Sequence, residues 1–193
     1  MTGTAEGGPP RLRAPLTRER VLDAAVAYAD QHGLAKLSMR KLAAELGFEV
    51  MSLYNHVTNK DDLIAGMVDR VAAEIEPPAV TGPDGWRTAM RASAVSARDA
   101  LLRHPWAESV WSTSLPGPAR TGYMDALLGG LDAAELGDDL VYLGFHAVTV
   151  HILGYIREEL DLQSGTDDLE AAAADFMAGL GDDHPHLETH IRA

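Results

Sequence analysis

The sequence predicts an all-α protein with a small three-helix head at the N-terminus and a larger helical body. Three observations lead to this prediction. The 193 residues are 46% hydrophobic and rich in Ala and Leu, a composition that favours helices. Apolar residues recur three and four positions apart through residues 17–76. After residue 77 the helical stretches continue with no strand-like alternation.

We expect three regions: a disordered N-terminal arm (1–16), the head (17–76) and the body (77–193). The arm is rich in Pro, Gly and Arg. The segment from Pro77 to residue 85 contains three Pro and two Gly residues, which break the helical pattern and mark the boundary. Helices of the body are expected at 84–103, 105–113, 118–134, 138–162 and 166–180.

The helices of the head begin and end at recognisable residues. Thr17 is expected to cap the first helix, which ends at Gly33. Ser38 is a good cap for the second helix, MRKLAAEL. Gly47 follows that helix directly and can adopt the left-handed conformation that ends helices.

A third, short helix is expected at residues 49–57. Leu53 and Val57 lie four positions apart, so they share its inner side. Asn59 can then cap a fourth helix. Two helices joined by a tight glycine-containing turn have the outline of a helix-turn-helix, whose second helix can enter the major groove of DNA.

Charge is distributed unevenly along the chain. The net charge is −13, but residues 1–60 carry eight Lys or Arg against six Asp or Glu. Residues 61–193 carry eight basic residues against 23 acidic ones. An acidic body repels a phosphate backbone, so any contact with DNA is expected to be confined to the head.

Residues 37–67, LSMRKLAAELGFEVMSLYNHVTNKDDLIAGM, resemble the DNA-binding head of the tetracycline-repressor (TetR) family of bacterial regulators. The segment LYNHVTNKDDL is the most specific part of this likeness. The resemblance covers residues 17–76 well and the body weakly. It implies binding to double-stranded operator DNA.

The resemblance also implies roles for individual residues. Val50, Met51 and Ser52 fall where base edges are read. Val50 and Met51 depart from polar readers, so we expect contacts with thymine methyl groups and DNA shape to contribute to sequence preference. The other expected DNA contacts, to phosphates or bases, are Ser38, Arg40, Tyr54, Asn55, His56 and Lys60.

For the body, the resemblance implies a homodimer that binds a small-molecule effector, and a repressor that this effector releases from a palindromic operator. The helix expected at 138–162 is uncharged for most of its length and suits burial on one side and a partner on the other. A further C-terminal helix usual in the family is expected to be missing before Ala193, which would weaken the dimer.

Aromatic residues of the body are candidates for the effector pocket. The chosen contacts are Trp106, Trp111, Tyr123 and His146. His104, His151 and Glu158 raise the alternative of a metal site, and Glu158 falls near the magnesium-linked glutamate of the tetracycline repressor. The rest of that drug pocket is not recognisable, so no metal and no cofactor are expected.

The sequence contains no cysteine and no apolar stretch of signal-peptide length at its start, which fits a cytoplasmic protein without a membrane segment. No nucleophile elbow, P-loop or dinucleotide-binding turn was found, so no enzyme is expected. The alternative hypothesis is an all-helical small-molecule-binding protein or enzyme whose head is only structural.

Overall fold

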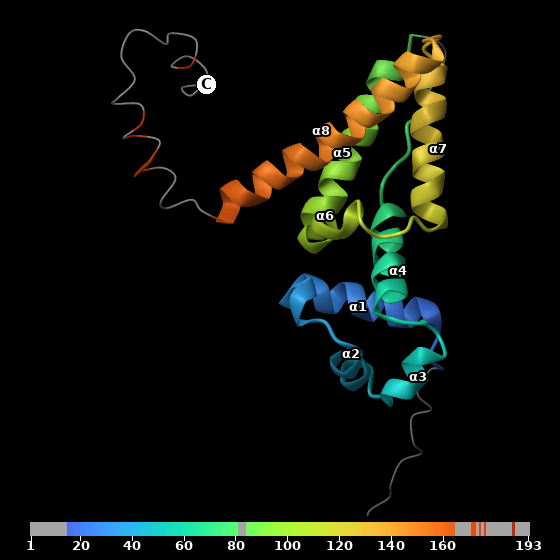
Figure 1. Ribbon diagram of the computed structural model, residues 1–193, viewed down its shortest axis with the longest axis vertical. Helices are drawn as coiled ribbons and strands as arrows, with labels where there is room; N and C mark the ends of the chain where they lie inside the picture. The colour runs from blue at the N-terminus through green and yellow to red at the C-terminus, as the bar shows by residue number, and fades with distance from the viewer. Residues whose placement is uncertain are drawn as a thin grey trace, which may run out of the picture.

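The computed structural model describes residues 15–80 and 84–164, together with single positions between 171 and 187. The described residues form eight α-helices and one 3₁₀ turn without a strand, which confirms the all-α prediction. These elements are α1 (Arg18–His32), η1 (Leu34–Lys36), α2 (Met39–Leu46), α3 (Val50–Tyr54), α4 (Lys60–Ala72), α5 (Trp86–Arg103), α6 (Pro105–Trp111), α7 (Pro118–Asp132) and α8 (Asp138–Ser164). Figure 1 shows α2 and α3 at one end of the molecule and α5, α7 and α8 at the other.

The helices of the head begin and end where the sequence predicts. The Thr17 hydroxyl accepts a hydrogen bond from the amide of Arg20 at 3.2 Å, and the Ser38 hydroxyl accepts one from the amide of Lys41 at 3.3 Å. Gly47 ends α2 with φ 71° and ψ 33°, the left-handed conformation that glycine adopts without a steric penalty. Local sequence signals therefore set the limits of α1 and α2.

Helix α3 is shorter than the predicted segment. It spans Val50–Tyr54, and a turn takes up the next two residues. Leu53 and Val57 are almost completely buried in the core of the head, as predicted from their spacing. The opposite side of this short segment faces away from the core.

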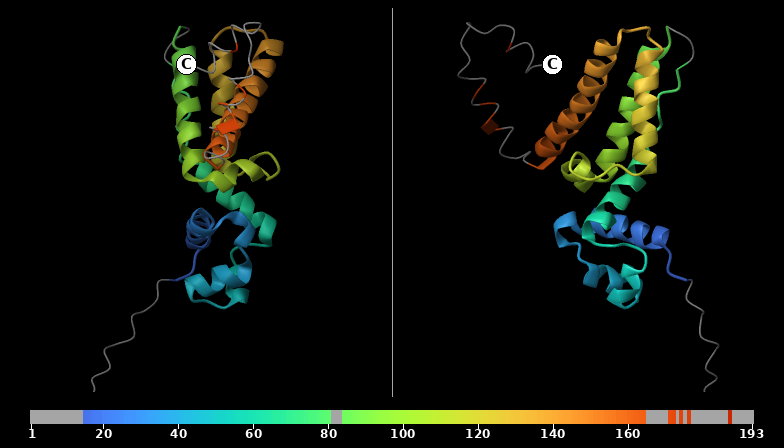
Figure 2. Two further views of the ribbon diagram at one scale, coloured as in Figure 1. Left: turned by 90° about the vertical axis from the view of Figure 1, so that its left-hand side faces the viewer. Right: turned by 45° about the vertical axis from the view of Figure 1, so that its right-hand side comes forward.

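Helix α4 connects the head to the body. It contacts α1 in the head and α5, α6 and α7 in the body, and Figure 2 shows it running from one part into the other. At its start the Asn59 side chain accepts a hydrogen bond from the amide of Asp62 at 2.8 Å. Near its end the Asp69 carboxylate accepts hydrogen bonds from the amides of Ala119 and Arg120, at 3.3 and 2.9 Å. Asp69 thus caps α7.

The residue at the cap position of α7 is Gly117, which has no side chain to serve as a cap itself. A Cβ atom at Gly117 would lie 2.4 Å from Cγ of Asp69, well inside van der Waals contact. The absence of a side chain at this position therefore lets the α4 carboxylate reach the first turn of α7.

In the body, α8 packs against α5, α6 and α7. Ile152 and Ile156 face this core and are buried. The ends of α5, α6, α7 and α8 differ from the predicted ends by no more than two residues. The helix predicted at 166–180 falls almost wholly outside the residues that the structure describes.

Candidate DNA-binding and effector sites

Helices α2 and α3 lie at the end of the molecule away from the body (Figure 1). Nine residues in or next to α2, α3 and the first turn of α4 are here called the α2–α3 face. Met51 is 71% exposed and Tyr54 43% exposed. None of the nine is buried. The α2–α3 face consists of Ser38, Arg40, Val50, Met51, Ser52, Tyr54, Asn55, His56 and Lys60.

Two helix N-termini border this face. The first intrahelical bond of α2 runs from the amide of Leu42 to the carbonyl of Ser38, and that of α4 runs from Leu63 to Asn59. The amides of Met39 and Lys60, which precede those bonds, have no carbonyl partner within their own helices. Amides at a helix N-terminus, with the positive end of the helix dipole behind them, favour anions such as phosphate.

An ion pair that the sequence analysis missed lies behind this face. Arg18 in the first turn of α1 binds the Asp62 carboxylate through both terminal nitrogens, at 2.6 and 3.2 Å. These hydrogen bonds hold the pKa of the Asp62 carboxyl at about 2, below its usual value of 3.8. No local signal could have revealed the pair, because 44 residues separate its members.

A second polar cluster, partly buried, joins the head to the body. The ring nitrogens of His104 lie 2.8 Å from an Asp30 oxygen in α1 and 3.1 Å from a Glu74 oxygen just after α4. The indole N–H of Trp106 donates to Asp30 at 2.7 Å. His104 and Trp106 are therefore residues of the head–body contact, and the indole N–H of Trp106 is already engaged.

This cluster also bears on the metal alternative. His104 is buried between Asp30 and Glu74, whereas His151 and Glu158 are exposed on α8. Within the described part of the chain, no three His, Asp or Glu side chains are grouped so that they could hold a metal ion. The three residues named in that alternative are not brought together.

Two of the four predicted effector contacts meet in the core of the body. Trp111 and Tyr123 line a small apolar cavity of about 20 Å³ between α5, α7 and α8. Burial raises the pKa of the Tyr123 phenol, against a smaller opposing effect of the Ser93 hydroxyl. No hydrogen bond of ordinary geometry satisfies the Tyr123 hydroxyl among the described residues. Trp106 and His146 do not line this cavity. His146 is exposed on α8, where its ring packs edge-on against Tyr142.

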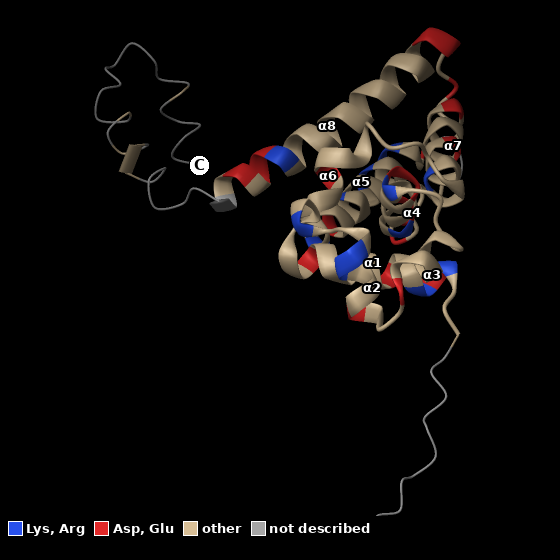
Figure 3. Ribbon diagram, turned by 60° about the horizontal axis from the view of Figure 1, so that its bottom comes forward, with Lys and Arg blue, Asp and Glu red and all other residues tan. Residues whose placement is uncertain are grey.

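The outer side of α8 carries a row of exposed small and apolar residues, here called the α8 stripe. Its members alternate three and four positions apart, and Leu143 and Val150 are more than half exposed. In Figure 3 most of α8 is tan, between acidic residues at its start and charged residues near its end. Residues Asp138–Leu162 are long and apolar enough to cross a membrane, and 6% of that span's most apolar part is buried. The α8 stripe consists of Leu140, Leu143, Ala147, Val150 and Gly154.

Comparison with known sequences identifies both parts of the chain. Residues 21–67 match the family of bacterial regulatory proteins, tetR family, and residues 78–192 match the tetracyclin repressor-like C-terminal domain. The HTH-type transcriptional repressor DrrR1 of Streptomyces coeruleorubidus is 37% identical over 80% of this chain, which spans 60% of that protein. An HTH-type transcriptional regulator of Saccharopolyspora erythraea is 32% identical, covering 97% of this chain and 90% of the regulator.

Solved structures agree with this identification. ActR of Streptomyces coelicolor, in complex with actinorhodin, superposes with a TM-score of 0.80 at 28% identity, covering 92% of this chain and 86% of ActR. BioQ bound to its double-stranded DNA operator superposes with a TM-score of 0.66 at 29% identity, covering 78% of this chain and 89% of BioQ. The chain belongs to the TetR family of bacterial regulatory proteins, which are DNA-binding regulators and not enzymes.

Proposed function

We propose that this protein is a transcriptional repressor of the cytoplasm that binds a palindromic DNA operator through the α2–α3 face and leaves it when a small molecule binds the body. The observation that carries the proposal is the α2–α3 face itself. It combines an exposed short helix with two capped helix N-termini, at the end of the molecule where the body does not cover it. BioQ bound to its DNA operator supports the same use of the head.

Within this proposal the residues of the face fall into two groups. Met51, Ser52 and Val50 lie in the first turns of α3 and would contact base edges in the major groove. The half-buried Val50 would add an apolar contact at the edge of that set. Tyr54, His56 and Lys60 would bind phosphates, with Asn55 beside them. Ser38 and Arg40 would contact the DNA backbone or bases.

The effector site that we propose is the apolar cavity lined by Trp111 and Tyr123. A cavity of about 20 Å³ is smaller than an effector, so binding requires α7 and α8 to move apart. The unpaired Tyr123 hydroxyl would supply the hydrogen bond that fixes the effector's orientation. ActR in complex with actinorhodin supports effector binding in a body of this fold.

The α8 stripe is proposed as the homodimer interface. Apolar residues spaced three and four apart form the seam along which helices pack with knobs in holes. No Asp, Glu, Lys or Arg occurs between Leu140 and Ile156, so a second copy could pack there without burying a charge. A symmetric dimer would present two heads to the two halves of a palindrome.

Binding to the DNA upstream of its own gene tests the proposal. Affinity should fall steeply with salt, by a slope of about 0.9 for each phosphate neutralised. A shuffled fragment of equal length is the control, and binding to it should be weaker. Equal binding to both fragments, or negligible binding at low salt, would contradict the proposed function. A thermal-shift screen of small molecules would then identify the effector, which should release the DNA.

A further inference from the structure

Helix α3 has few contacts of its own that could fix its direction. It is five residues long and Leu53 is its one buried side chain. A helix this short is not stable alone, so its orientation depends on its neighbours. Reading base edges requires that orientation to be precise, because hydrogen bonds and methyl contacts operate within a few tenths of an ångström.

Arg18 reaches this segment from α1. One terminal nitrogen of its guanidinium donates to the carbonyl of His56 at 2.7 Å, in the turn that ends α3. Both terminal nitrogens bind Asp62 in the first turn of α4. The planar guanidinium thus fixes the end of α3 and the start of α4 relative to α1, an arrangement that a lysine cannot reproduce.

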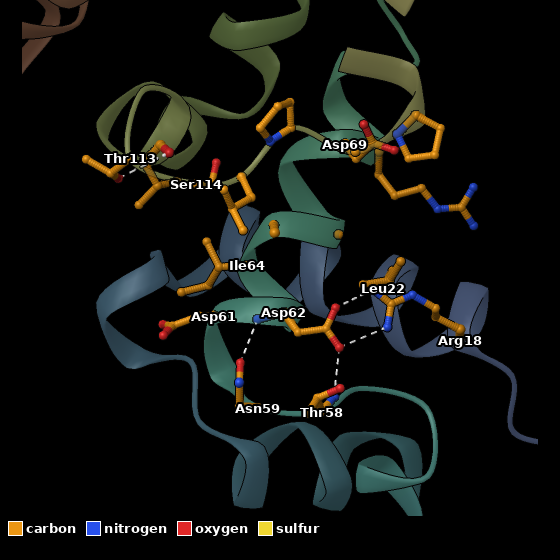
Figure 4. Close-up of a pocket in the computed structure, with 18 of the residues that line it drawn as sticks. Arg18, Leu22, Thr58, Asn59, Asp61, Asp62, Ile64, Asp69, Thr113 and Ser114 are labelled. Carbon is orange, nitrogen blue, oxygen red and sulfur yellow. Dashed lines mark hydrogen bonds and ion pairs between the residues drawn. The ribbon is translucent and has the colours of Figure 1, made fainter. Parts of the chain in front are cut away.

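Asp62 closes the network from the other side. Its carboxylate accepts the amide of Thr58 at 2.7 Å, and its own amide donates to the Asn59 side chain at 2.8 Å. Figure 4 shows these bonds converging on Asp62 between Arg18, Thr58 and Asn59. Every residue of the α3–α4 connection from His56 to Asn59, apart from Val57, is thereby held by a backbone or side-chain hydrogen bond to this network.

The charge of Arg18 is balanced within this network. Its guanidinium is paired with a carboxylate whose pKa is about 2, so the pair is ionised and carries no net charge near neutral pH. His56 and Lys60, two of the proposed phosphate contacts, adjoin the atoms that Arg18 and Asp62 hold. Arg18 is therefore better suited to placing these contacts than to neutralising a phosphate itself.

We propose that Arg18 and Asp62 are positioning residues for DNA recognition: the pair sets the angle of α3 and the places of His56 and Lys60 on the operator. This inference rests on the proposed function of the α2–α3 face. It assigns a role to two residues that lie behind that face and need not touch DNA.

The same two helices provide a matched control. Arg70 of α4 pairs with Asp23 of α1 at 3.0 Å, and the exposures of the Arg70 and Arg18 side chains are 39% and 40%. This second pair also joins α1 to α4 but has no hydrogen bond to the α3–α4 connection. Arg18→Lys can therefore be compared with Arg70→Lys, since both keep the positive charge. Asp62→Asn can be compared with Asp23→Asn, since both remove one negative charge.

The experiment measures binding of each variant to the upstream fragment and to the shuffled fragment, well below each variant's melting temperature. Arg18→Lys and Asp62→Asn should lower the ratio of the two affinities about ten-fold, the effect of losing one charge-assisted hydrogen bond. The two controls should change it less than about two-fold. The salt dependence of Arg18→Lys should equal that of the wild type, because the charge is kept.

A second measurement does not depend on DNA. In the free protein, amide hydrogen exchange across residues 50–60 should be faster in Arg18→Lys than in Arg70→Lys. Equal exchange in the two variants would overturn the positioning role even if no operator is known. Equal loss of affinity for both fragments, with a smaller salt slope in Arg18→Ala, would overturn it in favour of a direct phosphate contact. Failure of the wild type to prefer the upstream fragment would count against the proposed function instead.

Discussion

Met51 in the head and Val150 in the body are almost equally exposed, at 71% and 68%, yet their surroundings are opposite. Met51 lies on a short helix that also carries Ser52 and Tyr54 and is followed by Asn55 and His56. Val150 lies in the middle of a long helix, in a run of 17 residues, from Leu140 to Ile156, without a formal charge. Exposure alone therefore does not distinguish the two surfaces, whereas the groups around each exposed side chain do.

The two surfaces also differ in how they are supported. In the head, the buried Leu53 and Val57 are supplemented by hydrogen bonds and an ion pair from Arg18 of α1, which hold the end of α3 and the start of α4. The α8 stripe rests on the apolar contacts of the opposite side of its helix, through Ile152 and Ile156. A polar network fixes directions, as recognition of DNA bases requires, whereas an apolar face needs area and complementary shape.

The largest effect is expected from a charge in the α8 stripe. Val150→Glu should convert the proposed dimer to a monomer, because a carboxylate would be buried without a partner. Operator affinity should then fall by about 100-fold, since two linked heads bind a palindrome with avidity. Analytical ultracentrifugation and gel-shift titration measure both effects. Val95→Glu, on the outer side of α5 and 50% exposed in the wild type, is the control. An unchanged sedimentation coefficient in Val150→Glu would rule out this interface.

Removing a charge from the α2–α3 face should have a smaller and more uniform effect. Lys60→Ala should weaken binding to every DNA sequence alike, by about ten-fold, and reduce the salt slope by about 1. Arg91→Ala in α5 removes the same charge from the body and should leave both quantities unchanged. A change in sequence preference in Lys60→Ala would show that Lys60 does not act as a phosphate contact.

A change at Met51 should instead alter which sequence is preferred. Truncating its side chain in Met51→Ala removes apolar contact with base edges, which is expected to cost about 1 kcal/mol or more at the matched base pair. Affinity for unrelated DNA should stay within about two-fold. Selection from a randomised operator library, performed for wild type and variant, measures the preference. Identical selected sequences would exclude Met51 as a base reader.

The space around two glycines differs between the head and the body. A Cβ at Gly66 of α4 would lie 2.7 Å from a Leu22 methyl group, whereas a Cβ at Gly122 of α7 would meet no atom within 4 Å. Gly66→Ala should destabilise the protein by about 1 kcal/mol through overpacking. Gly122→Ala should stabilise it by about 0.5 kcal/mol, because alanine is the better helix former. Urea titration of both variants measures the change in the free energy of unfolding, which should be negative for Gly66→Ala and positive for Gly122→Ala.

The last expected effect concerns acid. The pKa of Asp62 is lowered to about 2 in the folded protein, so its ion pair stabilises the fold above the usual value of 3.8. That contribution should be lost as pH falls from about 4 to about 2, because the unfolded chain then binds the proton more readily. Asp62→Asn should show a shallower loss of stability over this range. Parallel curves for wild type and Asp62→Asn, measured by urea titration at each pH, would contradict the assignment.

Local features of this fold could be predicted from the sequence. The caps at Thr17, Ser38 and Asn59 and the left-handed Gly47 depend on residues three or four positions apart, and all four occur as predicted. The inward direction of Leu53 and Val57 follows in the same way from helical spacing. The residues of the α2–α3 face were chosen mainly from the resemblance to the TetR family, and their DNA contacts remain predictions.

Contacts between distant segments could not be predicted. The predicted end of α3 was too late: His56 lies in a turn, and its carbonyl accepts a hydrogen bond from Arg18, 38 residues earlier. Trp106 was chosen as an effector contact because it is aromatic, but its indole N–H binds Asp30, 76 residues earlier in the chain. An indole or guanidinium group carries no signal in the sequence of which carboxylate it will meet.

The cap of α7 has a mechanical consequence. The amides of Ala119 and Arg120 in the first turn of α7 bind the Asp69 carboxylate of α4. Gly117, the residue at the cap position of α7, makes no side-chain cap. A tilt of α4 that withdrew Asp69 would leave two amide groups without a protein acceptor, at a cost of about 1 kcal/mol each. A small movement of α4 is therefore expected to move α7 with it, so the two helices should behave as one rigid unit where they meet.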